Sequence, residues 1–88
     1  MTKILNAVMT DKSLSVEAKA IFAYIFSFCN LCSDVVLDTR LIMSDLRISK
    51  DRFYKHRKSL INKNFVMVKQ LQVDGIFGNT LYEIKVGD

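Results

Sequence analysis

The chain has 88 residues, half of them hydrophobic, with six Phe, three Tyr, three Gly and no Pro, and a formal net charge of +4. This length and composition predict one ordered domain, residues 1–88, and exclude linkers and low-complexity segments. The most apolar run, residues 18–31, is shorter than the roughly 20 residues that cross a bilayer, and no secretory signal pattern precedes it. We therefore expect a cytoplasmic protein without membrane contact.

The first elements predicted along the chain are a lead-in segment and a helix. Residues 3–10 are amphiphilic and are expected to cross the domain as a strand or an irregular arm. Ser13 or Ser15 then caps a first helix, whose apolar stripe consists of Leu14, Ala18, Ile21, Ile25 and Phe28. Phe22, Tyr24 and Phe26 lie off this stripe, so they must be covered by other elements of the domain or by a second subunit.

Cys29 and Cys32 form a C-x-x-C motif at the end of this helix. A reactive cysteine pair needs a helix N-terminus to lower a thiol pKa, and these two residues lie at the opposite end of the helix. A structural zinc ion needs four ligands, and His56 is the only further nitrogen or sulfur ligand that the sequence offers. We interpret both cysteines as small buried hydrophobes and predict no metal or cofactor. Because the chain also lacks a phosphate-binding glycine loop and a serine elbow, we predict that it is not an enzyme.

A helix-turn-helix pattern follows. Residues 34–37 are short and rich in β-branched side chains, which predicts a strand. Asp38 then caps a second helix over residues 39–46, and a turn at residues 47–49 leads to a third helix capped by Ser49. Two short helices joined by about three residues, the second of them basic, are typical of the helix-turn-helix.

The segment 47–63 holds seven basic residues and one acid, a formal charge of +6 against +4 for the whole chain. At about 100° per residue, Phe53, Leu60 and Ile61 share one face of the third helix, and the opposite face consists of Asp51, Lys55, Lys58 and Asn62. A charge concentrated on such a helix indicates a nucleic-acid reader, and the alternative is a solvated face that keeps a small domain soluble. Asp51 is expected to stabilise the helix N-terminus.

Arg57 falls between Phe53 and Leu60 on the inner face of this helix. Its stem can pack while its charged head reaches a polar partner, so we predict partial burial with the guanidinium directed to an acidic residue or a DNA phosphate.

The C-terminal part predicts a hairpin. Asn64 is suited to a left-handed C-cap, and the pattern then changes to period two, with Val66, Val68 and Gln70 on one side. Turn residues begin at Asp74, and a second strand follows with Tyr82, Ile84 and Val86 on one face. The predicted fold is therefore an α+β winged helix-turn-helix domain with the order α-β-α-α-β-β and a short N-terminal arm.

Several short motifs carry a family resemblance: Ile4-Leu5-Asn6, Asp11-Lys12, Leu14-Ser15 with Ala18-Lys19, Ile48-Ser49-Lys50, and Gly75-Ile76-Phe77-Gly78-Asn79 with Tyr82-Glu83-Ile84. In them the chain resembles the winged-helix proteins of phages and plasmids of low-GC Gram-positive bacteria, which include replication initiators and replisome organisers. The chain departs from that pattern at Arg47, where a small residue often opens the turn, and at Arg57, where an aliphatic residue usually packs inward.

The resemblance implies sequence-specific binding of double-stranded DNA, in replication initiation or transcriptional control, with Lys50, Arg52, Lys55 and Lys58 on the DNA. Tyr54, which flanks the outward face, and Lys69 complete the expected DNA-binding set. The wing has no other base from residue 65 to residue 82, however, which favours the alternative below. The alternative is a protein-interaction module, either a homodimer or a small phage-type inhibitor of a host protein, with a host or phage replication protein as partner. Ile76 and Phe77 at the hairpin tip would then fold back on the core or contact a partner, and on DNA they would wedge into a minor groove.

Overall fold

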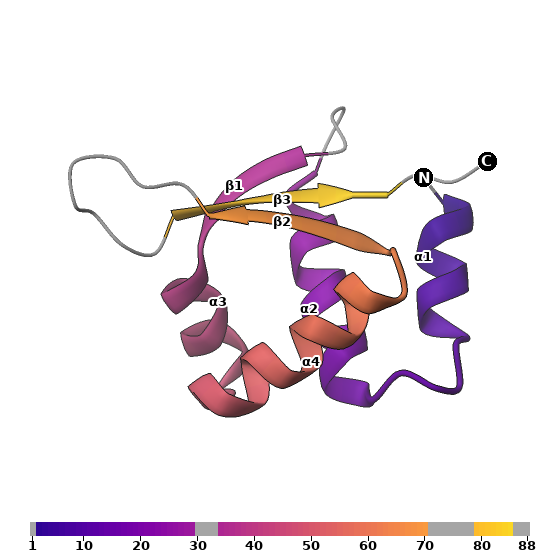
Figure 1. Ribbon diagram of the computed structural model, residues 1–88, viewed down its shortest axis with the longest axis horizontal. Helices are drawn as coiled ribbons and strands as arrows, with labels where there is room; N and C mark the ends of the chain where they lie inside the picture. Colours follow the sequence, from indigo (N-terminus) through magenta and orange to yellow (C-terminus); the bar gives the residue numbers. More distant parts are fainter. Residues whose placement is uncertain (1, 30–33, 71–78, 86–88) are drawn as a thin grey trace.

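The computed structural model describes residues 2–29, 34–70 and 79–85. These residues form an α+β domain of four helices and a three-stranded antiparallel sheet: α1 Thr2–Met9, α2 Val16–Ser27, β1 Asp34–Asp38, α3 Thr39–Leu46, α4 Lys50–Asn62, β2 Val66–Gln70 and β3 Asn79–Ile84. Figure 1 shows two layers, with the sheet above and the helices below it. No helix in the described part has the length and hydropathy to cross a membrane.

The helix ends follow from capping residues in the sequence. Ser15, Asp38 and Ser49 accept backbone N–H groups of the first turns of α2, α3 and α4, which confirms Asp38 and Ser49 and selects Ser15 over Ser13. Arg47 and Asn64 adopt left-handed backbone with φ of 54° and 65° after α3 and α4. The residues that follow them donate backbone hydrogen bonds of 3.0 Å to the carbonyl five positions earlier, which closes each helix.

The prediction of a strand or an irregular arm for residues 3–10 is wrong, because this segment is the helix α1. Ile4 and Val8, four residues apart, lie on one face of α1 and are buried in the core. An apolar pair at this spacing stabilises a helix only when another element covers it, and α2 does so here. The observed order of elements is therefore α-α-β-α-α-β-β.

Helix α2 is the centre of the core, as its apolar stripe predicts. Ala18, Ile21 and Ile25 are fully buried, and so is Phe22, whose cover comes from the domain itself. Tyr24 is held at the surface of the core, because its hydroxyl donates a 2.5 Å hydrogen bond to Asp45 of α3. This hydrogen bond raises the pKa of Tyr24 to about 12.

The remaining predictions for the end of α2 have mixed outcomes. Phe28 was expected on the buried stripe, but it is 48% exposed because the helix ends at Ser27 and Phe28 is its C-cap. Cys29 is buried, as predicted, and Cys32 lies outside the described residues. Within the described ranges, no cluster of three His, Cys, Asp or Glu residues is suited to a metal ion.

The sheet has the order β1-β3-β2, with Val36 and Lys69 both paired to Leu81 on the central strand. Alternation places Val66, Tyr82 and Ile84 on the inner face against the helices, as the period-two pattern predicts. The outer face carries Val36, Leu81, Met67 and Lys69, and no helix or strand of the described residues covers it in Figure 1. The predicted hairpin tip with Ile76 and Phe77, and Val86 after β3, lie outside the described residues.

Candidate nucleic-acid interface

Helix α4 divides into an inner face, an outer face and two flanks. Phe53 and Leu60 are fully buried on the inner face. The outer face consists of the exposed residues Asp51, Lys55, Lys58 and Asn62. The orientation predicted from the helical period is therefore confirmed, and the two lysines project into solvent.

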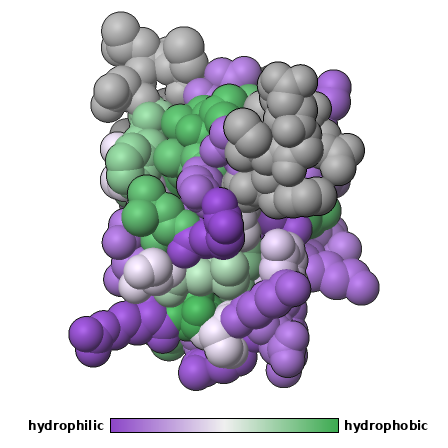
Figure 2. Space-filling view, turned by 90° about the vertical axis from the view of Figure 1, so that its left-hand side faces the viewer, coloured by the Kyte–Doolittle hydropathy of each residue, from purple (hydrophilic) through white to green (hydrophobic). Residues whose placement is uncertain are grey.

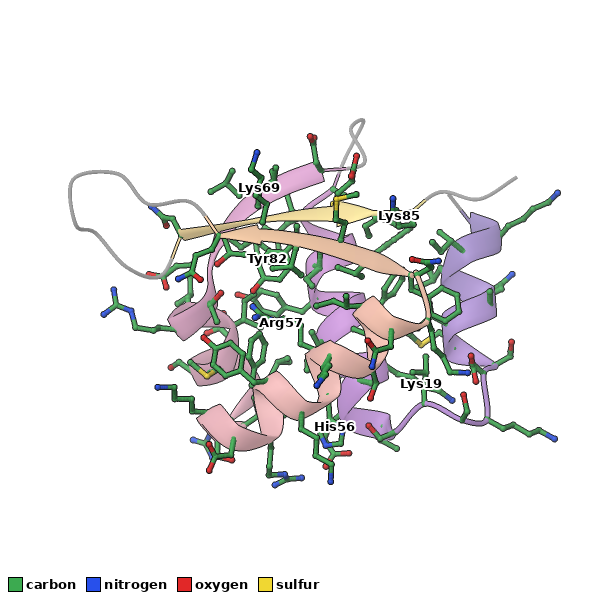
Figure 3. All side chains as sticks on the ribbon, in the orientation of Figure 1. Lys19, His56, Arg57, Lys69, Tyr82 and Lys85 are labelled. Carbon is green, nitrogen blue, oxygen red and sulfur yellow. The ribbon has the colours of Figure 1, made fainter. Side chains whose placement is uncertain are left out.

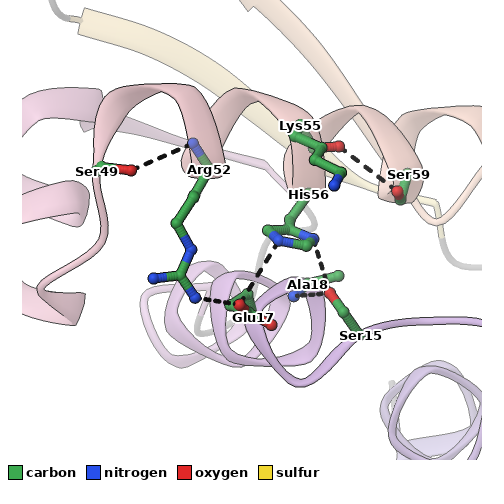
Figure 4. A network of polar contacts seen from close by, with 8 residues as sticks. All are labelled: Ser15, Glu17, Ala18, Ser49, Arg52, Lys55, His56 and Ser59. Carbon is green, nitrogen blue, oxygen red and sulfur yellow. Dashed lines mark hydrogen bonds and ion pairs between the residues drawn. The ribbon is translucent and has the colours of Figure 1, made fainter.

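One flank of α4 is fastened to the start of α2 by the polar contacts in Figure 4. Arg52 forms an ion pair with Glu17, which also lies 3.7 Å from His56 Nε2. His56 Nδ1 is 2.8 Å from the hydroxyl of Ser15. The hydrogen bond from Arg52 is the main cause that lowers the pKa of Glu17. Arg52, predicted to bind DNA, is thus used at least partly between the two helices.

Ser15, His56 and Glu17 are the residue types of a hydrolytic triad, but their geometry serves another purpose. The Ser15 oxygen accepts the backbone N–H of Ala18 at 3.1 Å and so caps α2. The serine also meets Nδ1 and the carboxylate approaches Nε2, the reverse of the arrangement in serine hydrolases. The group joins α2 to α4 and fixes how α4 lies on the core.

The other flank of α4 faces the sheet and holds Arg57. Its guanidinium lies 4.6 Å from the ring centroid of Tyr54 and 5.5 Å from that of Phe53, and Nη1 donates a 3.3 Å hydrogen bond to Tyr82 Oη. Figure 3 shows Arg57 and Tyr82 between α4 and the sheet. The predicted partial burial is confirmed. The partners in the described part are aromatic rings and a phenol, however, and no carboxylate forms an ion pair with Arg57 there.

The structure brings only part of the predicted DNA-binding set together. Lys50, Tyr54, Lys55 and Lys58 are exposed along the same helix, α4. Lys69 lies on the outer face of the sheet and points away from α4 (Figure 3), because it alternates with Val68 along β2. No ion pair recorded among the described residues uses Lys50, Lys55 or Lys58.

Sequence reasoning missed one basic residue beside this set. Arg40 of α3 has a side chain 72% exposed, is 3.7 Å from Asp38, and lines the same cavity as Lys50 and Tyr54. Its position beside α4 depends on how α3 and α4 cross, which no local pattern shows. Figure 2 faces the side of the molecule where α3 lies and shows long hydrophilic side chains along its lower and right-hand edges.

The chain matches no protein-family model, no curated protein and no solved structure.

Proposed function

We propose that the domain is a winged helix-turn-helix that binds double-stranded DNA sequence-specifically, in phage or plasmid replication initiation or in transcriptional control. In this assignment α3, the turn at residues 47–49 and α4 are the helix-turn-helix. The strands β2 and β3 carry the wing. The element order after α1 and the antiparallel sheet are compatible with this fold.

The observation that carries the proposal is that the lysines on the outer face of α4 are exposed and form no recorded ion pair in the described part. Burial of Phe53 and Leu60 fixes the helix against the core, while Lys55 and Lys58 stay exposed and outside every ion pair recorded in the described part. An α-helix fits the major groove of B-DNA. Lysines that are not already paired can neutralise DNA phosphates, and the release of counterions from the DNA then favours binding. Asp51 is the one acid on this face, in the first turn of α4 where it faces the positive end of the helix dipole.

Fluorescence anisotropy with a labelled random-sequence duplex, repeated over a series of salt concentrations, tests this proposal. If about four to six phosphates are neutralised, log K should fall with log salt at a slope of roughly −4 to −5. Binding that does not depend on salt, or no binding at low salt, would contradict it. Selection from a randomised duplex pool then tests whether α4 reads a sequence, since an enriched motif is expected.

A second candidate function, a protein-interaction module, is supported by a different surface. On the open face of the sheet Val36 is 50% exposed and Met67 is 44% exposed. Light scattering of the free protein and of the Val36→Lys/Met67→Lys double variant tests this candidate. A dimeric mass that becomes monomeric in the double variant would support it, and a monomeric wild type would count against a homodimer.

A further inference from the structure

A cavity of about 500 Å³ lies between α3, the first half of α4 and the strands β2 and β3. This volume falls within the range of roughly 300 to 1,000 Å³ that is usual for small-molecule sites. Met43 and Val68 supply an apolar wall. The charged residues that line the cavity in the described part are all basic: Arg40, Lys50 and Arg57. The chemistry of the cavity therefore favours an anion.

Arg57 is positioned before any ligand arrives. The ring of Tyr54 lies against its guanidinium, and Tyr82 Oη accepts from Nη1 at 3.3 Å. A guanidinium has five N–H donors, and this is the one hydrogen bond that it makes to described residues. Arg57 lines the cavity and its other donors make no hydrogen bond to described residues, so they can serve a ligand, and little side-chain entropy remains to be lost on binding.

A network of three hydroxyl groups next to Arg57 has more hydrogen-bond donors than acceptors available to them. Thr39 Oγ1 lies 2.7 Å from Tyr82 Oη and 3.0 Å from Thr80 Oγ1. Tyr82 Oη accepts from Arg57, which has no acceptor atom to offer in return. The three hydroxyl protons, one each on Thr39, Thr80 and Tyr82, can therefore be donated only in the two hydroxyl–hydroxyl contacts, and each contact takes one proton. One proton is therefore left without an acceptor among the described residues, whichever way the network is oriented. When Tyr82 donates to Thr39, the spare proton belongs to Thr39 or Thr80, which line the cavity and are each 4% exposed, so an anionic oxygen there favours this orientation and accepts that proton.

We propose that this cavity binds a phosphate group. A phosphate offers several oxygens at once, which suits the planar fork of Arg57, the ammonium of Lys50 and a hydroxyl donor together. Arg40, which is also paired with Asp38, adds positive potential at the rim. The phosphate can come from a free organic phosphate such as a nucleotide, or from the backbone of bound DNA. The site stands on the cavity and its donors and does not depend on DNA binding.

NMR titration of the whole chain with sodium phosphate and, separately, with adenosine 5′-monophosphate tests the proposal, with ionic strength held constant by sodium chloride. We expect saturable shifts of the Arg57 Nε–H and Lys50 amide signals. Arg57→Gln and Lys50→Gln should each weaken binding about tenfold or more, the usual loss for a hydrogen bond to a charged group. Lys12→Gln removes the same charge at an exposed position between α1 and α2, outside the cavity lining, and as the matched control should bind as the wild type does.

Two results would overturn the site. Either the shifts with phosphate equal those with chloride alone, or both the Arg57 and the Lys50 variants bind phosphate as tightly as the wild type. Arg57 is partly buried, so its variant is compared only if its amide spectrum shows the native fold. Lys50 is exposed, and its variant keeps the test decisive if Arg57→Gln unfolds.

A short DNA duplex added to the same samples separates the two sources of phosphate. If DNA shifts the Arg57 signal and inorganic phosphate competes with it, the cavity holds a backbone phosphate. If DNA binds without moving that signal while adenosine 5′-monophosphate still saturates it, the ligand is a free organic phosphate. If DNA does not bind at all, the proposed function fails, and the phosphate titration still decides the cavity.

Discussion

Ser15 and His56, 41 positions apart in the chain, are joined by a 2.8 Å hydrogen bond between the start of α2 and the middle of α4. The same serine oxygen accepts the Ala18 N–H, so one hydroxyl both starts a helix and holds its neighbour. Glu17 and Arg52 extend the contact across the two helices (Figure 4). The candidate DNA-binding helix is thus aligned by polar groups on α2 as well as by its buried face.

The first prediction concerns this shared hydroxyl. Ser15→Ala should lower the free energy of unfolding by about 1 to 2 kcal/mol, because it removes a helix cap and leaves His56 Nδ1 without that partner. Ser49→Ala is the matched control, since Ser49 also caps a helix but at a longer 3.4 Å and without a second partner among the described residues. Urea unfolding should show the larger loss for Ser15→Ala. An equal loss in the two variants would mean that the bond to His56 adds nothing.

The second prediction is a pH dependence that comes from Glu17. The hydrogen bond from Arg52 lowers the folded-state pKa of Glu17 below its ordinary value of 4.5. Folding therefore favours the ionised carboxylate. Its contribution to stability is present above about pH 4.5 and is lost as the pH falls through the lower folded-state pKa. Urea unfolding of the wild type between pH 6 and pH 3 should show this loss, on top of that from other acids.

Glu17→Gln should flatten this part of the pH dependence, because the variant has no carboxylate at position 17 to protonate. Arg52→Gln, which removes the main cause of the lowered pKa, should flatten it as well. A wild-type pH profile in both variants would show that the Glu17–Arg52 pair does not couple to folding.

The third prediction tests the orientation of α4. Lys55→Glu should leave the free energy of unfolding within about 0.5 kcal/mol and weaken DNA binding strongly, because it places a negative charge on the exposed outer face. Lys12→Glu makes the same change in charge at an exposed position between α1 and α2 and should weaken binding much less. Arg57→Leu should change stability by no more than about 1 kcal/mol, since Tyr82 keeps its bond to Thr39. If Lys55→Glu unfolded the domain in thermal melts while Arg57→Leu alone abolished DNA binding, the assigned faces would be reversed.

The fourth prediction concerns the turn between α3 and α4. Arg47 has φ of 54°, a left-handed conformation that costs a residue with a Cβ roughly 1 kcal/mol and glycine almost nothing. Arg47→Gly should therefore stabilise the domain by up to about 1 kcal/mol. Asn64→Gly, at φ of 65°, should gain less because asparagine tolerates this conformation well. Thermal unfolding of both variants measures the difference, and a destabilised Arg47→Gly would show that the arginine side chain supports the turn.

Local chemistry in the sequence predicted much of the fold. Ser49 and Asp38 were identifiable as caps because their oxygens act on the next two or three residues, and Asn64 because few residues accept a left-handed backbone. The alternation of side chains in β2 also predicts that Lys69 lies on the outer face, because its neighbour Val68 faces inward.

Other features depend on contacts between distant elements. Helix α1 was missed because its eight residues form a helix only with Ile4 and Val8 packed on the core. The pairing of Arg52 with Glu17, and the place of Arg57 under Tyr82, require the crossing of α4 with α2 and with the sheet. Sequence periodicity gives the faces of α4 but does not show which neighbour each face meets.

The position of β3 between β1 and β2 also sets the order in which the domain can be completed during synthesis. Strands β1 and β2 are synthesised before β3, but they do not pair with each other in the native sheet. Each can form its native pairing only after residues 79–84 have been synthesised. Until then their backbone donors and acceptors are open, and the helices lack the inner face that Tyr82 and Ile84 provide. We therefore expect the nascent chain to hold its helices as a loose, chaperone-accessible cluster and to gain a protease-resistant structure in one late step.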